Sequence, residues 1–295
     1  MEILVNHEPL DFKLENESSV GEIVDGLAHW LSAGRFAITA IDVNATSYAL
    51  HDRESWADIQ IDDVDRLAVE ALPLTDVDHA TLVALEEYFS ILAECLETRN
   101  ELPLGELVRE LPYVRARLTQ FFPALASEDG ETSVLLDDRL EQGKMPHPEN
   151  ARSLSAEVND IRTIIRSRER EYREPARELA LTLGHLSATR PALIEVPVQL
   201  QTGKEQEAMQ TVVTLTELLT RVVRLVPLVE RSEDDADINV EGVRRFAEEL
   251  LPHLIELKDA LEIQDTVLIG DLLEYEVAPR LEALHRLLPG GTQEQ

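Results

Sequence analysis

The chain has 295 residues, and 44% of them are hydrophobic, which is enough to form the cores of two domains. Its 58 acidic residues outnumber its 27 basic ones, and the formal net charge of −31 makes nucleic acid and anionic membranes unfavourable partners. A single cysteine, Cys95, excludes an intramolecular disulfide and a zinc site built from several cysteines.

The acid excess has two interpretations, a salt-rich cytoplasm or a basic protein partner. Only four of the basic residues are lysines, and the other 23 are arginines. Salt screens self-repulsion, and hydrated carboxylates keep a protein soluble at high salt. Residues 1–72 already hold 15 acids and 4 bases, so the excess is spread along the chain. This spread favours the salt-rich, halophilic-like interpretation over a dedicated acidic patch.

The sequence carries no signal for a membrane segment. No stretch approaches the roughly 18 consecutive apolar residues that a membrane-spanning helix needs. The first ten residues, MEILVNHEPL, lack a basic region followed by an apolar one, which a secretory leader would show. We therefore expect a cytoplasmic protein without membrane insertion.

The first 72 residues combine several strand signals with one helix signal. Ser19 and Glu22 have capping-box spacing and predict a helix that ends near Gly34. Runs of alternating or β-branched residues predict strands, and the first two form a hairpin. These runs lie at residues 3–5, 10–14, 36–43, 48–50 and 67–72.

This order of elements, with ILVNHEPLDF as the hairpin and SSVGEIVDGL as the helix start, resembles the ubiquitin-like β-grasp fold. The resemblance covers residues 1–72 and implies a small module used as a docking surface, which we expect to be a domain over residues 1–73. Ubiquitin and the similar sulfur-carrier proteins end in a flexible Gly-Gly carboxy terminus. Here the last strand, Ala68 to Leu72, runs into Pro73 instead. The resemblance therefore does not imply carrier chemistry.

Beyond Pro73 the apolar residues recur every three to four positions, which is typical of helices. We expect a mainly antiparallel all-α bundle over residues 74–289 and a disordered tail over residues 290–295. The fold class is therefore α+β. Helices are predicted at residues 76–99, 102–122, 134–140, 151–187, 190–201, 202–229, 243–257 and 273–288.

The helix expected at the centre of the bundle runs from Thr202 to Val229. Thr202 and Glu205 have capping-box spacing at its start, and a stripe of apolar residues follows. A second apolar row, which includes Met209 and Val223, makes the stripe too wide for one partner helix to cover. We expect this helix to be buried among several others.

Residues 166–178, RSREREYREPARE, form the one strongly mixed-charge run. Arginine and glutamate at helical spacing pair on a solvated surface, and this interpretation is favoured. Pro175 is expected to kink the helix. The alternative is a groove for an acidic ligand or a partner, completed by polar residues of the last helix. Its candidate residues are Arg166, Arg168, Arg170, Arg173, Arg177, Glu274 and Tyr275.

Three motif candidates fail on their own residues. Residues 203–204 lack the first glycine and the hydroxyl residue of a phosphate-binding loop. Residues 235–246 lack the glycine and the final glutamate of a calcium loop. Glu282 and His285 lack the second copy that a di-iron bundle needs. We therefore predict no catalytic residues, no metal and no cofactor.

These observations predict a non-catalytic protein that binds other proteins as a scaffold or assembly adaptor, with the β-grasp module as one docking site. Association of its apolar stripes would produce a homo-oligomer. One alternative is a chaperone or regulator that sequesters a basic partner, which should be released as salt rises. Another is a helical-bundle enzyme or ligand-binding protein with a dispersed site.

Overall fold

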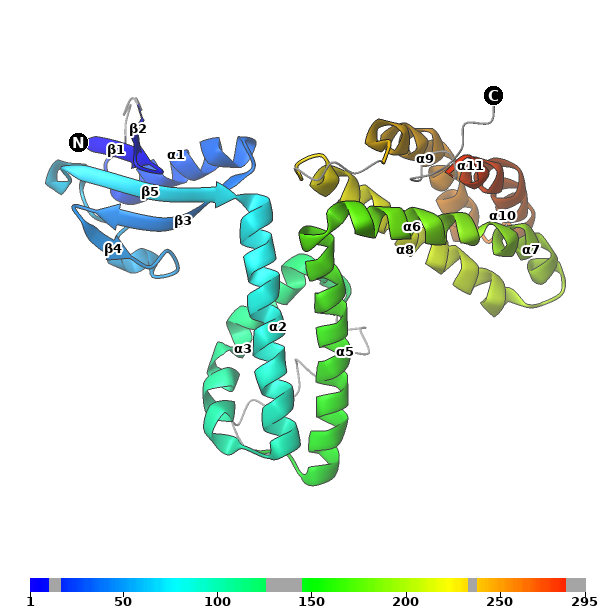
Figure 1. The fold of residues 1–295 in the computed structure, drawn as a ribbon, viewed down its shortest axis with the longest axis horizontal. Coiled ribbons are helices and arrows are strands. Elements are labelled where there is room, and N and C mark those ends of the chain that lie inside the picture. The colour runs from blue at the N-terminus through cyan, green and yellow to red at the C-terminus, as the bar shows by residue number, and fades with distance from the viewer. Residues whose placement is uncertain (11–16, 126–144, 233–237, 285–295) are drawn as a thin grey trace. The chain divides into compact units, whose positions relative to one another are not determined.

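The computed structural model describes residues 1–10, 17–125, 145–232 and 238–284 (Figure 1). The chain divides into two units, Met1–Glu169 and Arg170–Gln295. A sheet and helices form the first unit, and helices form the described part of the second, as the α+β prediction requires. The predicted domain boundary after residue 73 stays a prediction, and the predicted tail lies outside the described residues.

The first unit begins with a five-stranded mixed sheet and one helix, α1 (Val20–Ala33). The spatial order of the strands is β2-β1-β5-β3-β4. β1 and β5 run parallel, while the other neighbouring pairs are antiparallel. This arrangement is compatible with a β-grasp-like fold. The strands are β1 (Glu2–Val5), β2 (Glu8–Pro9), β3 (Phe36–Val43), β4 (Thr46–Tyr48) and β5 (Arg66–Pro73).

The start of α1 is close to the predicted capping box. The Ser19 hydroxyl accepts from the backbone N–H of Glu22 at 3.4 Å. The Glu22 carboxylate, however, accepts from the backbone N–H of Ser18 at 2.6 Å, one residue before the expected donor. This bond lowers the pKa of Glu22. From this start the helix buries an apolar face, including Val20, Ile23 and Leu27, against the sheet.

Three long helices complete the first unit: α2 (Leu74–Thr98), α3 (Glu101–Phe121) and α5 (Pro148–Arg173), whose last turn belongs to the second unit. The predicted apolar face of α2 is buried, as Leu82, Phe89 and Leu96 show. The predicted helix at residues 134–140 lies outside the described residues. Short 3-10 turns occur at Arg53–Ser55, Ile61–Asp63 and Pro123–Leu125.

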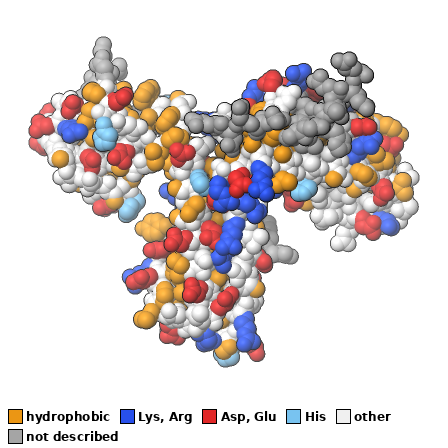
Figure 2. Space-filling model, in the orientation of Figure 1, with side chains coloured by type: hydrophobic (Ala, Val, Ile, Leu, Met, Phe, Trp, Pro, Cys, Tyr) orange, Lys and Arg blue, Asp and Glu red, His pale blue; other side chains and the backbone are white. Residues whose placement is uncertain are grey.

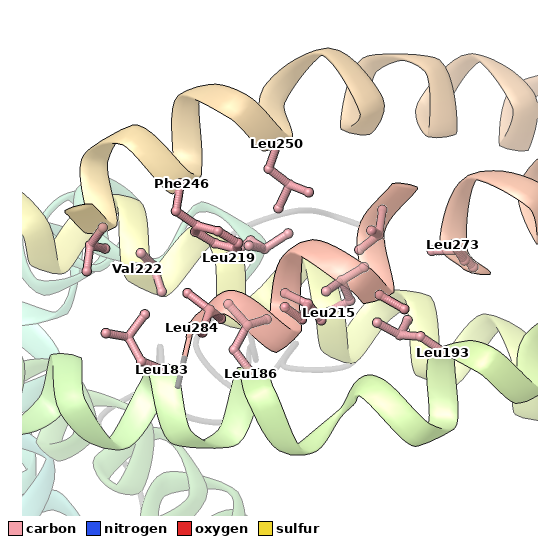
Figure 3. Close-up of a cluster of buried hydrophobic side chains, with 14 of the residues drawn as sticks. Leu183, Leu186, Leu193, Leu215, Leu219, Val222, Phe246, Leu250, Leu273 and Leu284 are labelled. Atoms are coloured by element: carbon pink, nitrogen blue, oxygen red, sulfur yellow. The ribbon is translucent and has the colours of Figure 1, made fainter. Parts of the chain in front are cut away.

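The second unit is built around one apolar core to which its helices all contribute (Figure 3). Leu186 of α6, Leu215 of α8 and Leu250 of α9 are all fully buried in it. The helices are α6 (Pro175–Ala188), α7 (Arg190–Gln201), α8 (Glu205–Val229), α9 (Val240–Glu262), α10 (Thr266–Asp271), the π-helical η5 (Leu272–Val277) and α11 (Ala278–Ala283).

Two predicted helices are divided in the structure. The segment at residues 151–187 breaks at Glu174, and Pro175 opens α6 instead of kinking one helix. Proline has no N–H to donate, so it fits the first turn of a new helix. The last predicted helix, at residues 273–288, starts within η5 and continues as α11, and its predicted face, including Leu273 and Leu281, is buried.

The predicted capping box at Thr202 is wrong. Thr202 ends α7, and its hydroxyl donates back to the Val198 carbonyl at 2.7 Å. Gly203 follows in the left-handed region at φ +77°, a common way to end a helix. α8 then starts at Glu205 without a side-chain cap. The sequence spacing fitted a helix start, but the backbone uses these residues to end the preceding helix.

The central helix, α8, is only partly covered. Its main apolar stripe, including Val212, Leu215 and Val222, is buried, as predicted. Its second row is not, because Met209 is 40% exposed and Val223 is 62% exposed. The prediction that neighbouring helices bury both rows is therefore wrong, since α6, α7 and α9 leave one face of α8 open.

Candidate functional site

The structure gathers three of the predicted groove residues, Arg170, Arg173 and Arg177, in one pocket of the second unit. The pocket has a volume of about 380 Å³. It forms where the end of α5 and the start of α6 meet α8, which contributes Arg221. The remaining lining residues are Glu174, Glu178, Leu181 and His185. We call this the arginine pocket.

Two largely buried carboxylates pair with arginines of this region: Glu178, which lines the arginine pocket, and Glu171, which does not. The Glu171 side chain is 3% exposed and contacts Arg221 and Arg224, each at 3.0 Å. The Glu178 side chain is 10% exposed and accepts from Arg221 Nη2 at 2.5 Å. Arg221 Nε lies near Glu171 but is not aligned for a hydrogen bond, so a buried donor of this guanidinium lacks an acceptor among the described residues. The glutamates hold the arginines in fixed positions.

At the rim, Glu174 joins two further arginines. It accepts from Arg177 Nη1 at 2.9 Å and from Arg173 Nε at 3.3 Å. These hydrogen bonds, that of Arg177 first, lower the pKa of Glu174, so the carboxylate stays ionised. Together with Arg170 and Arg224, five arginines surround three glutamates. Counted over the residues that the structure describes, this cluster holds two more arginines than glutamates in a strongly acidic chain.

The other predicted groove residues do not line the arginine pocket, and their grouping in one ligand site stays a prediction. Arg166 belongs to the first unit, where its Nη2 lies 2.7 Å from Oε1 of Glu86. Arg168 lies over the ring of Phe122 in the same unit. Glu274 and Tyr275 lie on η5 of the second unit. A π-helical turn alters the register that the helical spacing assumed.

Tyr275 does not behave as a buried pocket residue. Its side chain is 63% exposed, and the neighbouring carboxylate of Glu274 raises the pKa of its hydroxyl. An exposed phenol beside a carboxylate needs no internal partner. Tyr275 is therefore an exposed residue of η5.

A second candidate is an apolar groove between α8 and α9, with a volume of about 660 Å³. Buried side chains such as Leu219 and Leu257 form its floor, and the exposed Val223 forms part of its wall. We call it the α8–α9 groove. Its lining residues are Val212, Thr216, Leu219, Thr220, Val223, Leu254, Leu257, Lys258, Leu261 and Glu262.

The rim of the α8–α9 groove is acidic. Lys258 Nζ lies 2.7 Å from Glu262 Oε1 and 3.9 Å from Asp259 Oδ1, and the bond to Glu262 raises the pKa of Lys258. One lysine thus faces two carboxylates. The exposed Glu256 and Glu217 add negative charge on the same two helices. A partner would therefore meet an apolar floor with negative charge beside it.

A third hollow, of about 510 Å³, lies in the first unit between the sheet and helices α2 and α3. Leu72 and Tyr113 line it and are 46% and 71% exposed. The nearby Tyr88 hydroxyl donates to the Leu107 carbonyl at 2.8 Å, and burial raises its pKa. This hollow lacks converging charges comparable to those of the arginine pocket.

Other site classes were sought among the residues that the structure describes. In these ranges no three His, Cys, Asp or Glu side chains are grouped so that they could hold a metal ion. Within the same ranges no helix has the length and apolar character needed to cross a membrane. Cys95 is a buried thiol whose pKa is raised by burial.

Comparisons with known proteins give two partial matches to families. Residues 1–73 match the TP0873 N-terminal domain, and residues 181–287 match a domain of unknown function, DUF8042. A relative from Treponema pallidum (strain Nichols), described as an uncharacterized protein, is 30% identical over 111 residues. The match covers 37% of this chain and 54% of that protein, so the chain spans about half of the relative. No solved structure matches the chain.

The segments matched by the two families contain different parts of the candidate sites. The first match ends at Pro73, where β5 also ends. The second match contains all the residues of the α8–α9 groove. It begins after Arg177, so three arginines of the arginine pocket lie outside it. The groove thus belongs to a single family segment, whereas the pocket extends beyond that segment.

Proposed function

We propose that the protein is a non-catalytic adaptor that binds a basic amphipathic helix of a partner protein in the α8–α9 groove. The observation that carries this proposal is the apolar groove left open by the second row of α8. We also propose that the N-terminal sheet is a β-grasp module and a second docking surface. Its edge strands, β2 and β4, offer backbone groups to which a partner strand could add.

The shape and composition of the groove suit a helix. Two helices enclose it, and its floor is formed by leucine and valine side chains such as Val212, Leu219 and Leu257. A partner helix with apolar residues at positions i, i+3, i+4 and i+7 would bury one stripe in such a groove. Each fully buried leucine would contribute about 1.5–3 kcal/mol. Three or four such anchors would be enough for specific binding.

Charge selects the kind of partner. The chain has a net charge of −31, and Lys258 is already paired with acidic neighbours at the rim. A second copy of this chain would bring the same negative charge, so self-association is disfavoured. A helix with lysine or arginine beside its apolar stripe complements both the floor and the rim.

The experiment uses a fluorescent 20-residue peptide with leucines on one helical face and lysines elsewhere. Fluorescence anisotropy with the full chain should show saturable binding. A shuffled peptide of the same composition, which has no apolar face, should bind at least about tenfold more weakly, because it cannot fill the groove. Equal binding of the two peptides would show that charge alone is responsible and would contradict the proposal.

A matched pair of variants locates the binding. Val223→Lys places a positive charge in the groove wall and should weaken binding of the helical peptide about tenfold. Val198→Lys is the control, because Val198 of α7 is 60% exposed, close to the 62% of Val223, and does not line the groove. The control should bind like the wild type. Equal effects of both variants would exclude the groove as the site.

The acidic rim also supports a second candidate function, a chaperone that sequesters one basic partner. The two functions differ in their response to salt. An adaptor held mainly by apolar contacts retains the helical peptide at about 1 M salt, where the Debye length is about 3 Å. A chaperone held mainly by charge releases it. The same anisotropy titration, repeated across a salt series, separates them.

A further inference from the structure

We infer that the arginine pocket binds a small dianion, whose negative charge is carried by phosphate or carboxylate oxygens. This site is separate from the α8–α9 groove and does not depend on the adaptor function. Its lining residues come from the α5–α6 junction and from Arg221 of α8. Figure 2 shows basic side chains gathered near this junction, on a molecule whose other charged side chains are largely acidic.

The first argument is the local charge. Among the described residues, four arginines and two glutamates line the pocket, a surplus of two positive charges, although the whole chain has 58 acids and 27 bases. The buried glutamates, Glu171 and Glu178, are 3% and 10% exposed. Glu171 does not line the pocket, and little of Glu178 is exposed there. Guanidinium groups therefore make up most of the charged lining that a ligand would contact.

The second argument is the number of hydrogen-bond donors. Each guanidinium carries five N–H donors, and each carboxylate offers about four acceptor positions. The Arg170 side chain is half exposed, and its Nε lies 3.8 Å from Glu178 Oε1, which is too long for a hydrogen bond. The buried Nε of Arg221 also lacks an aligned acceptor. The pocket thus has donor capacity beyond what its own glutamates use.

The third argument is geometry and size. A guanidinium presents its donors in a planar fork that matches the paired oxygens of a phosphate or a carboxylate. The volume of about 380 Å³ falls in the range of small-molecule sites. His185 adds a ring nitrogen to the lining. The arginines are held by Glu171, Glu174 and Glu178, so little reorganisation is needed when a ligand binds.

The surrounding charge limits the ligand to a small molecule. A nucleic acid would extend beyond the pocket and meet the acidic surface, where repulsion acts over a Debye length of about 8–10 Å. A dianion that fits inside the pocket makes only the local contacts. The surplus of two positive charges among the pocket-lining residues then favours binding of the dianion.

Titration calorimetry of the full chain with inorganic phosphate and, separately, with succinate tests the inference. We expect saturable binding of at least one of the two, with a Kd below about 10 mM. Binding of phosphate alone would assign the site to phosphate groups, and binding of succinate alone to carboxylates. Both results support a dianion site. The absence of saturable binding by either anion would overturn it.

Two variants distinguish specific binding of an anion in the pocket from non-specific attraction of anions to arginine. Arg177→Gln removes a rim guanidinium whose side chain is 73% exposed, so the fold should be unaffected. We expect it to weaken anion binding about tenfold, because it removes a charge-assisted hydrogen bond. Arg245→Gln makes the same change in charge at an exposed position of α9 outside the pocket. Equal effects of the two variants would overturn the inference.

Discussion

Glu171 and Glu174 are neighbours in one charged run of the sequence, yet the structure gives them different surroundings. The side chain of Glu171 is 3% exposed and lies against Arg221 and Arg224, while that of Glu174 is 33% exposed at the rim. Helical spacing predicted that Arg170, Arg173 and Arg177 share a face. It could not predict Arg221, because the contacts of this residue with Glu171 and Glu178 join α5 and α6 to α8, which is far along the chain.

The difference in burial predicts different effects of the same substitution. Glu171→Gln should lower the free energy of unfolding by about 3 kcal/mol, because it removes the buried counter-charge of Arg224 and leaves Arg221 with Glu178 alone. Glu174→Gln should leave the urea midpoint within experimental error, because its ion pairs are screened by solvent. Urea denaturation of both variants measures this. Equal midpoints would mean that Glu171 has no structural role.

Tyr88 offers a residue-scale test that includes pH. Tyr88→Phe should lower the free energy of unfolding by about 1–2 kcal/mol, because the buried Leu107 carbonyl loses its donor. Tyr113→Phe, at a position 71% exposed on α3, should have little effect. Burial raises the pKa of Tyr88, so its contribution is complete below the unfolded pKa of about 10 and is lost as pH rises above it.

That pH dependence is checked by urea denaturation between about pH 9 and pH 11. The wild type should lose stability faster than Tyr88→Phe over this range, because only the wild type has a phenol that ionises more easily in the unfolded chain. Parallel curves for the two proteins would show that Tyr88 does not contribute to alkaline unfolding.

At the scale of elements, the turn between α7 and α8 shows where sequence patterns are ambiguous. Thr202 and Glu205 fit a capping box, but the left-handed Gly203 makes the same residues a helix end. A threonine at this position can cap the following helix or donate its hydroxyl to the preceding turn, and the sequence is the same in both cases. The break at Pro175 was expected as a kink, because spacing alone cannot decide between a kink and a new helix.

Two glycine substitutions in the second unit test this account of the turn. Gly203→Ala should destabilise the protein by about 1–2 kcal/mol, because alanine is strained at φ +77°. Gly184→Ala lies inside α6 with nothing within 4 Å of the added Cβ, and it should stabilise the protein by about 0.5–1 kcal/mol. Thermal denaturation of both variants measures the sign of each change in stability. A stabilising Gly203→Ala would contradict the turn geometry.

At the scale of the whole molecule, the change of hydrophobic period near Pro73 predicted the α+β class and the sheet-and-helix start of the chain. The division into two units at Glu169 was not predictable, because it falls inside the continuous helix α5, where no loop or composition change marks it. The wide apolar face of α8 was also visible in the sequence. Which part of it stays uncovered depends on long-range packing of α6, α7 and α9.

The central claim is that the open face of α8 receives a basic amphipathic helix. Methyl NMR of the full chain during titration with the helical peptide tests it most directly. The account predicts shifts at groove methyl groups, those of Val212, Leu219, Val223 and Leu257, and unchanged signals from Val198. Binding of the peptide with unchanged signals from these groove methyl groups would contradict the claim.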